Sequence, residues 1–347
     1  MKNLLFVTNS LIGGGSERVL AAVASELAGR GHRVSILSYR DGDTYPLHPD
    51  IRVRTLHNEQ DKGKRIAAIR RTVRELAPDC VIAFEYFVNM QAVLACLGLH
   101  TRLVISERND PAREGGGFPK RYIRNFLYRF CDVLVCQTPD ARDYFPGYVR
   151  RRAVLIPNPV KSDLPEPWQG ERSKTVVNFC RLQPQKNLNL LVDAFALFRQ
   201  THPEYRLAVY GNGDGEEALR RHIREAGLED RVDLYPSCPD VHRRILDAAM
   251  FVSSSDYEGL SNSMLEAMAI GLPTVCTDCP VGGARMVIRD GENGLLVPVG
   301  DREALAAAMC RVADDRALAE TLSQNGRILR EKLSIGVIAD EWERLIT

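Results

Sequence analysis

The sequence has no apolar run long enough to cross a membrane. A spanning helix needs about 18 or more consecutive apolar residues, and polar residues interrupt every apolar stretch of this 347-residue chain. The first seven residues resemble a short signal peptide, but Thr8, Asn9 and Ser10 end the apolar run and no small-residue cleavage site follows. We interpret this segment as the buried first strand of a cytoplasmic protein.

The sequence also lacks a regular framework of cysteines. Its nine cysteines are an odd number and are scattered without repeated spacings, which favours free thiols in a reducing compartment. Cys276 and Cys279 form one C-x-x-C pair, but a structural zinc site would need a second pair. We interpret the pair as structural.

No complete phosphate-binding fingerprint is present, although two glycine loops come close to one. Residues 13–16 (Gly-Gly-Gly-Ser) open a helix without the Lys-Ser/Thr of a P-loop, which argues against ATP hydrolysis. Residues 211–215 depart from G-x-G-x-x-G because Glu216 takes the sixth place, and an NAD enzyme would need an acidic residue where residues 38–40 read Ser-Tyr-Arg. The first loop alone fits a plain strand-to-helix turn as well as a ligand site, and the second alone fits a plain turn better.

Charge is balanced over the whole chain but not along it. Residues 1–160 hold 24 Lys and Arg against 16 Asp and Glu, whereas residues 161–347 hold 22 against 29. A basic half indicates a surface that meets anions, such as phosphates or a membrane. We expect no nucleic-acid partner, because the basic residues are not joined to a known reading motif.

Strands and helices are predicted to alternate throughout. Short continuous apolar runs between helical patterns are typical of parallel sheets that are covered on both faces. Predicted strands are 3–8, 32–38, 80–84, 103–106, 133–137, 153–156, 175–178, 206–210, 232–234, 251–253 and 274–277. Predicted helices are 16–30, 66–76, 188–200, 216–226, 242–249, 261–270 and 335–346. The pattern restarts after a proline-rich stretch near residue 160, which predicts two doubly wound, Rossmann-like α/β domains, 1–160 and 161–347, that face a cleft.

The charged residues that most clearly indicate a ligand site lie in the second half of the chain. Arg181 and Lys186 follow the predicted strand 175–178 and precede a helix. Glu258 comes at the end of a strand, where open α/β sheets bind ligands, and Glu266 lies one turn into an otherwise apolar helix. A carboxylate in such surroundings is costly unless it meets hydrogen-bond donors such as ribose hydroxyls. The alternatives are solvated surface cations and a helix-start carboxylate that the helix dipole favours.

Taken together, these motifs resemble the retaining GT-B glycosyltransferases of family 4. The two carboxylates form the E-x7-E motif of that family, and the resemblance covers nearly the whole chain. It includes the glycine loops at 13–16 and 211–213, the two cations, and the segments 271–273 and 290–295. The chain is most similar to bacterial enzymes that extend lipid-linked or capsular glycans, including galactose and N-acetylgalactosamine transferases. The resemblance therefore implies a hexosyltransferase that uses a nucleotide diphosphate sugar, which we expect to be a UDP-sugar.

The resemblance also implies roles for individual residues. Arg181 and Lys186 would hold the donor diphosphate as catalytic cations, Glu258 would approach the donor sugar, and Glu266 would bind the ribose. Other expected donor contacts are Gly14, Gly15, Gly211, Gly213 and the helix-start residues Leu260, Ser261 and Asn262.

The acceptor side departs from the family pattern at one position. The family usually carries a histidine after a strand of the first domain, and here Arg108 stands at that place. We expect Arg108, with Ser16 and Asn89, to line the site for the acceptor or the sugar.

No protein nucleophile is evident, and the family is thought to react by front-face attack. No cofactor or fixed metal is implied. Asp41, Gly42 and Asp43 match the D-x-D motif of metal-dependent transferases of another fold, but they follow a first-domain strand, and we interpret them as a turn.

The segment from Lys120 to Phe130 alternates cations with large apolar side chains. Such a basic amphipathic helix is typical of contact with anionic lipid, although a core-packed helix with a solvated face fits equally well. A glycan or polyprenyl-diphosphate-linked acceptor would make membrane contact sensible. We therefore expect a cytoplasmic protein that can lie peripherally on the inner membrane, with the helix near 335–346 packing back on the first domain.

Two other functions fit the same sequence. A nucleotide-sugar epimerase or hydrolase of this architecture would share the diphosphate-binding residues, and a non-catalytic protein could bind a nucleotide sugar without reacting it.

Overall fold

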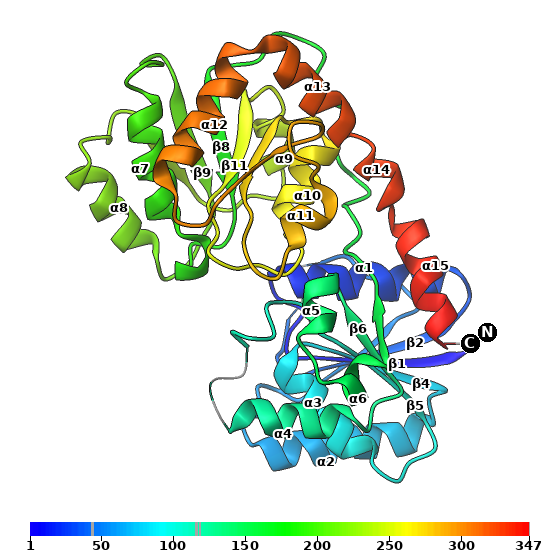
Figure 1. Ribbon diagram of the computed structural model, residues 1–347. Helices are drawn as coiled ribbons and strands as arrows, with labels where there is room; N and C mark the ends of the chain where they lie inside the picture. Colours follow the sequence, from blue (N-terminus) through cyan, green and yellow to red (C-terminus); the bar gives the residue numbers. More distant parts are fainter. Residues whose placement is uncertain (43–44, 115–116, 118, 347) are drawn as a thin grey trace. The chain divides into compact units, whose positions relative to one another are not determined.

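The computed structural model describes residues 1–42, 45–114, 117, 119–346 and divides the chain into two compact units. Unit 1 comprises Met1–Pro159 together with the final segment from Ile335, and unit 2 comprises Val160–Ser334. Each unit is a parallel sheet covered by helices (Figure 1).

The sheet of unit 1 has seven parallel strands in the order β3-β2-β1-β4-β5-β6-β7. The strands are β1 Asn3–Thr8, β2 Arg33–Ser38, β3 Arg52–Thr55, β4 Cys80–Phe84, β5 Arg102–Ser106, β6 Val133–Cys136 and β7 Ala153–Leu155. The central strands are buried on both faces, which explains their continuous apolar sequences. The strand order reverses between β1 and β4, and this switch point is where sheets of this kind bind ligands at the carboxyl ends of their strands.

Helices cover both faces of this sheet. They are α1 Gly15–Gly29, α2 Lys62–Leu76, α3 Tyr86–Cys96, α4 Lys120–Tyr128, α5 Pro139–Asp143, α6 Gly147–Arg150 and α15 Ile335–Ile346. Helices α1 and α15 pack together on one face, whereas α3 packs between α2 and α4 on the other (Figure 1).

The last helix of the chain belongs to unit 1. Trp342 of α15 is fully buried and its ring stacks on Phe84 with a centroid distance of 5.4 Å. Arg30, at the end of α1, donates to Asp340 and Glu343 over 2.6 and 2.8 Å. Buried aromatic packing and a network of charge-assisted hydrogen bonds therefore fix α15 to α1.

The sheet of unit 2 has six parallel strands in the order β10-β9-β8-β11-β12-β13. The strands are β8 Thr175–Phe179, β9 Arg206–Tyr210, β10 Val232–Tyr235, β11 Met250–Ser253, β12 Thr274–Thr277 and β13 Leu295–Val297. The helices are a 3-10 turn η1 Pro184–Lys186, α7 Leu188–Phe198, α8 Glu216–Glu225, α9 Val241–Arg244, α10 Asn262–Ala269, α11 Gly283–Val287, α12 Arg302–Asp314, α13 Arg316–Gly326 and α14 Leu329–Lys332. The order reverses between β8 and β11, so the loops that follow these two strands meet at one place.

The predicted fold class of two Rossmann-like domains is confirmed, while some local predictions were incomplete or wrong. Strands β3 and β13 and helix α3 were missed, and the helix predicted over 242–249 ends at Arg244. Residues 245–247 form a turn, and by Ala249 the backbone amide donates to Thr175 O of β8, so the helix has ended before β11 begins. In the D-x-D segment, Asp43 lies outside the described residues, and Asp41 lies 2.9 Å from His57.

Candidate functional site

The switch point of unit 2 brings the cation and the first glutamate of the sequence motif together. Lys186 ends η1 after β8, and Glu258 follows β11, the neighbouring strand. The Lys186 ammonium donates to Glu258 Oε1, and both side chains are largely buried, with 13% and 14% of their surface exposed. Gln185 Nε2 also donates to Glu258 Oε2 over 3.1 Å, so both carboxylate oxygens are held.

The ion pair keeps Lys186 charged. Burial lowers the pKa of Lys186, but the nearby carboxylate of Glu258 raises it by more. The pKa of Lys186 therefore lies above its ordinary value. The neighbouring Cys180 has its pKa raised to about 12 by burial, although Lys186 pulls it in the opposite direction. The site thus offers a fixed ammonium, and the thiol beside it stays neutral.

The backbone around Lys186 is fixed by side chains from the β11 loop. Asn187 has a positive φ of 43°, and its Nδ2 donates to Asp256 Oδ1 over 2.7 Å. The Ser254 hydroxyl donates to the carbonyls of Lys186 and Asn187 over 3.0 and 2.9 Å. The loop after β8 is therefore pre-organised, which reduces the reorganisation that binding an anion would require.

The second glycine loop, which follows β9, packs against the backbone of the loop that follows β8. A Cβ on Gly211 would lie 1.9 Å from the carbonyl oxygen of Cys180, and one on Gly213 would lie 2.4 Å from that of Leu182. The glycines thus allow the loops after β8 and β9 to touch. Arg181 lies exposed between these contacts and close enough to Lys186 to oppose its charge.

The second glutamate of the motif has a partner that the sequence did not suggest. Glu266 of α10 is 5% exposed, and its Oε2 lies 2.8 Å from His242 Nε2 on α9, which is 7% exposed. Because a carboxylate oxygen only accepts, the imidazole is the donor. The His242 ring in turn packs edge-to-face on Phe179, with centroids 5.4 Å apart. His242 therefore fixes the orientation of a buried carboxylate.

The residues at the start of α10 lie between the two glutamates. Ser261 is the N-cap, and its hydroxyl accepts from the Met264 amide over 3.4 Å. Leu260 is buried, whereas Ser261 and Asn262 are half-buried. The positive end of the helix dipole thus lies near Glu258, as an anion site at a helix start requires.

In unit 1, the first glycine loop follows β1 at its switch point. Gly14 is the N-cap of α1, and its amide donates to the Tyr45 hydroxyl over 3.0 Å, while that hydroxyl donates to Gly14 O over 2.9 Å. Gly15 is exposed, and Ser16 is half-buried. That Gly14 and Gly15 contact the nucleotide-sugar donor stays a prediction.

Arg108 lies at the carboxyl end of β5 and is held by neutral groups. Its guanidinium donates to Ser106 Oγ over 3.1 Å and to Asn158 Oδ1, and it lies 4.8 Å above the Phe84 ring. Burial, and secondarily the nearby Arg18, lowers the pKa of Arg108 to about 9. This cation is therefore destabilised in the described structure, and an anion would stabilise it.

Asn89, the third residue expected to line the acceptor site, is fully buried. Its Nδ2 donates to Ser106 O over 2.9 Å and approaches the Tyr128 hydroxyl at 3.3 Å. Its amide joins β5 to α4, so this geometry gives it a role in packing.

Sequence reasoning missed a buried acid next to Arg108. Glu107 is 2% exposed, the Tyr128 hydroxyl donates to it, and burial raises the pKa of its carboxyl. At the end of the adjacent strand β4, Glu85 has a φ of 80°, a strained conformation of the kind that gathers at functional sites. A signal for Glu107 was available, since an acid directly after an apolar strand is costly without a partner.

Among the residues that the structure describes, no cluster of three or more His, Cys, Asp or Glu is arranged to hold a metal ion.

Comparison with known families matches nearly the whole chain. The model of Glycosyltransferase Family 4 covers residues 13–164, and that of Glycosyl transferases group 1 covers residues 163–329. The chain is a family 4 glycosyltransferase. It is therefore an enzyme that transfers glycosyl groups, as predicted.

Relatives of this glycosyltransferase act in bacterial glycan assembly. One is the GalNAc-alpha-(1->4)-GalNAc-alpha-(1->3)-diNAcBac-PP-undecaprenol alpha-1,4-N-acetyl-D-galactosaminyltransferase of Campylobacter jejuni, 27% identical over all of this chain and 98% of that protein. Another is the lipopolysaccharide core biosynthesis glycosyltransferase LpsE of Rhizobium meliloti, 25% identical over 96% of both chains.

Solved structures confirm the GT-B fold. Anabaena Alr3699/HepE in complex with UDP-glucose aligns with a TM-score of 0.85 over 99% of both chains at 20% identity. TarM aligns with a TM-score of 0.83 over 100% of this chain and 99% of that one at 14% identity. Across the described residues, every helix is too short or too polar to cross a bilayer.

Proposed function

We propose that this glycosyltransferase moves a hexose or N-acetylhexosamine from a UDP-sugar to a glycan or polyprenyl-diphosphate-linked acceptor, with retention of the anomeric configuration. The observation that carries the proposal is the buried Lys186–Glu258 pair at the switch point of unit 2. The UDP complexes of fold neighbours and the lipid-linked substrate in the name of the Campylobacter relative support the donor and the acceptor class.

In this proposal the groups of unit 2 bind one donor along its length. Lys186 and Arg181 hold the diphosphate, Glu258 accepts from sugar hydroxyls, and Glu266 accepts from ribose hydroxyls. At an effective dielectric of about 20, a cation about 4 Å from a phosphate charge contributes about 4 kcal/mol. The leaving diphosphate gains charge in the transition state, so this attraction lowers the barrier.

The reaction itself needs no protein nucleophile. The bond from the anomeric carbon to the β-phosphate oxygen breaks while the acceptor oxygen bonds on the same face of the sugar. The acceptor proton passes to the departing phosphate oxygen. We further propose that unit 1 binds the acceptor, with Ser16 and Arg108 in contact with it, and that no metal takes part.

The proposal is tested with labelled nucleotide sugars and an acceptor, in excess chelator. Transfer with retention is the expected product, whereas C2 or C4 inversion of the sugar would identify an epimerase, and binding without turnover would identify a non-catalytic protein. A thermal-shift screen across UDP-, GDP- and ADP-sugars selects the base, since a ligand that binds only the folded state raises its melting temperature. Activity that needs an added divalent metal would contradict the metal-free scheme.

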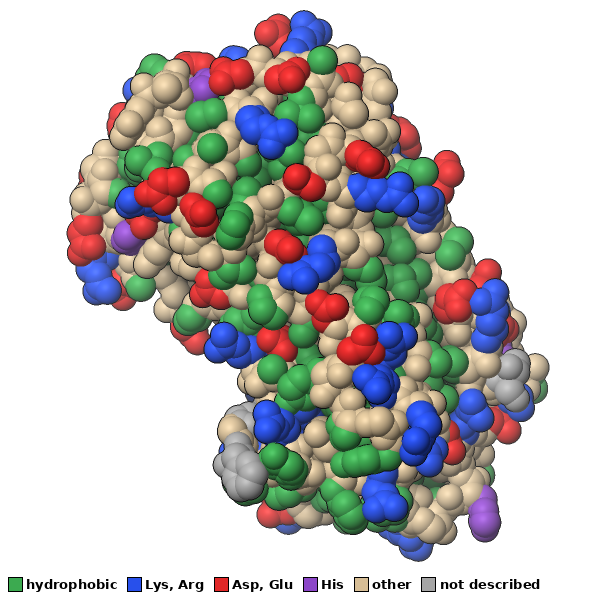
Figure 2. Space-filling model, viewed as in Figure 1, with side chains coloured by type: hydrophobic (Ala, Val, Ile, Leu, Met, Phe, Trp, Pro, Cys, Tyr) green, Lys and Arg blue, Asp and Glu red, His purple; other side chains and the backbone are tan. Residues whose placement is uncertain are grey.

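We also propose that α4 brings the enzyme to the membrane, at the cytoplasmic face. Tyr122, Ile123, Phe126 and Phe130 are 54%, 54%, 52% and 45% exposed. Lys120, Arg121 and Arg129 lie exposed on the same segment, and Lys and Arg side chains are spread over the part of Figure 2 that unit 1 occupies. Exposed rings beside cations are typical of helices that lie on anionic lipid.

Replacing both Ile123 and Phe126 with serine is expected to weaken binding to phosphatidylglycerol vesicles at least about tenfold. Each side chain contributes about 1 kcal/mol or more when its exposed apolar surface enters the lipid. Co-sedimentation with vesicles measures the loss. Tyr148→Ser removes an aromatic ring that is 45% exposed on α6 and serves as the control. Equal vesicle binding by the double variant and the control would rule out α4 as the contact.

The His242–Glu266 pair gives a further prediction for donor binding. His242→Phe keeps the ring packing on Phe179 but removes the donor to Glu266, and we expect the Kd for UDP to rise about tenfold. The value of kcat at saturating donor should change little, because this contact belongs to the nucleoside and not to the reacting bond. Calorimetry with UDP and with an analogue that lacks both ribose hydroxyls measures the effect. His242→Gln should restore most of the affinity, and a penalty that persists with the analogue would contradict the assignment.

A further inference from the structure

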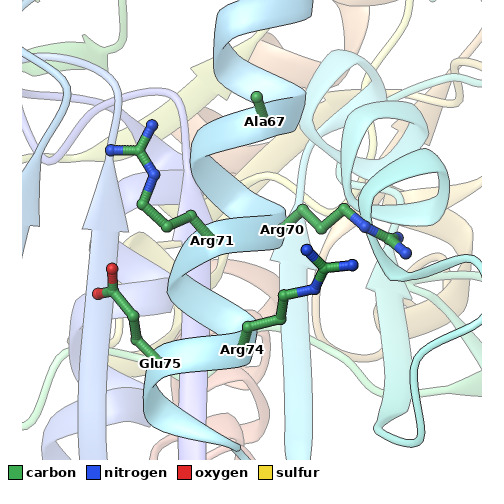
Figure 3. Close-up of a pocket in the computed structure, with 5 residues that line it drawn as sticks. All are labelled: Ala67, Arg70, Arg71, Arg74 and Glu75. Atoms are coloured by element: carbon green, nitrogen blue, oxygen red, sulfur yellow. The ribbon is translucent and has the colours of Figure 1, made fainter.

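A groove on α2, in unit 1, is not used by the proposed reaction. It encloses about 490 Å³ and is lined by Ala67, Arg70, Arg71, Arg74 and Glu75. Arg70 and Arg71 follow Ala67 by three and four residues, and Arg74 and Glu75 follow Arg71 by the same spacings, which places all five along one stripe of the helix. In Figure 3, Arg70 and Arg74 extend to one side of α2, and Arg71 and Glu75 extend to the other.

The charges of the groove do not cancel. The one acid in it, Glu75, already accepts from Arg54 on β3 over 2.7 Å. Arg70 donates to two neutral carbonyls at the end of α3, Ala95 O and Leu97 O, each over 2.8 Å. Arg71 and Arg74 are exposed and make no hydrogen bond or ion pair within the described part of the chain.

Exposed apolar side chains lie on α3, the helix that packs against α2. The Arg70 contact places Leu97 beside the groove, and Leu97 is 41% exposed. Leu94, one turn earlier on α3, is 38% exposed. The same helix α3 packs against α4, whose exposed rings we propose as the lipid contact. Guanidiniums beside apolar side chains match a ligand that carries both phosphate and hydrocarbon.

We propose that this arginine groove binds the phosphate groups of a lipid-borne phosphate ester. Arg71 and Arg74 donate to the phosphate oxygens, Arg70 holds the edge of the groove against α3, and Leu94 and Leu97 contact the first carbons of the chain. Guanidinium suits this role because its planar fork can donate two hydrogen bonds to one phosphate. The ligand is either the diphosphate of a prenyl-linked acceptor, a source that rests on the proposed function, or a phospholipid headgroup.

Two double variants of equal charge test the groove. Arg71→Gln with Arg74→Gln removes its two unpaired cations, and Arg33→Gln with Arg151→Gln removes two exposed cations elsewhere in unit 1. Calorimetry measures binding of inorganic diphosphate and of farnesyl diphosphate. Sedimentation measures binding to phosphatidylcholine vesicles with and without phosphatidylglycerol. We expect the groove variant to bind farnesyl diphosphate or phosphatidylglycerol about tenfold more weakly than the control variant does.

The binding measurements on the two double variants identify the ligand of the groove or overturn the proposal. Weaker binding of farnesyl diphosphate assigns the groove to a prenyl diphosphate, and weaker binding of phosphatidylglycerol alone assigns it to a headgroup. Equal binding by the two double variants, or a wild-type protein that binds neither lipid, overturns the proposal. Binding of UDP should be the same in all three proteins. A wild-type protein that fails to bind any nucleotide sugar would remove the proposed donor, yet it would leave the lipid result standing.

Discussion

Lys186→Ala is expected to lower kcat at least about a hundredfold, the order found when one donor to a transition-state charge is removed. In our proposal the ammonium of Lys186 lies on the leaving diphosphate, which gains negative charge as the glycosidic bond to it breaks. Turnover of a labelled UDP-sugar under saturating donor measures the effect. Lys332→Ala removes an exposed lysine on α14 and should leave kcat unchanged.

The same change also leaves Glu258 buried without its cation, which could lower activity through stability alone. A buried charge that loses its partner costs about 3–5 kcal/mol. The double variant Lys186→Ala with Glu258→Gln removes both charges, and we expect its melting temperature to recover while kcat stays low. Near-normal turnover in either variant, with the fold intact, would contradict the proposal that Lys186 stabilises the leaving diphosphate.

Gly211→Ala is expected to be strongly destabilising. The new methyl group would lie 1.9 Å from the backbone oxygen of Cys180, and only a shift of the loops after β8 and β9 can relieve that overlap. Overpacking of this kind costs about 1–3 kcal/mol or more, so we expect the melting temperature of unit 2 to fall by roughly 5–10 °C. Differential scanning calorimetry measures the shift.

Gly147→Ala is the matched control for that variant. Its Cβ would meet no atom within 4 Å and its φ is ordinary, so the change should be neutral or slightly stabilising. A Gly211→Ala protein that melts with the wild type would show that the two loops separate easily, and the pre-organised site that we describe would then lose its support.

The sequence was sufficient to predict the fold because the central strands of both sheets have continuous apolar sequences. Segments such as β9, predicted over 206–210, were found with their observed bounds. β3 was missed because it has only four residues and its side chains, Arg52 to Thr55, are almost all exposed. β13 has only three residues, too few for a pattern. Edge strands of this kind are defined by their neighbours rather than by their own composition.

The candidate site was predictable only in part. Glu258 and Lys186 carry a signal because each lies in the loop that follows an apolar strand, and the strand order then brings the two loops together. His242 gave no signal, since its partner Glu266 lies 24 residues further along the chain and only the packing of α9 against α10 joins them. The arginine groove was equally hidden, because the pairing of Arg54 with Glu75 decides which charges of α2 stay unmatched.

The placement of α15 has a consequence for biosynthesis. Unit 1 takes its first 159 residues from the start of the chain and its last helix from beyond residue 334. A ribosome must therefore complete all of unit 2 before Trp342 can fill its place beside Phe84. Until then Phe84 lacks the ring that stacks on it, so we expect active enzyme to accumulate only after α15 has left the exit tunnel.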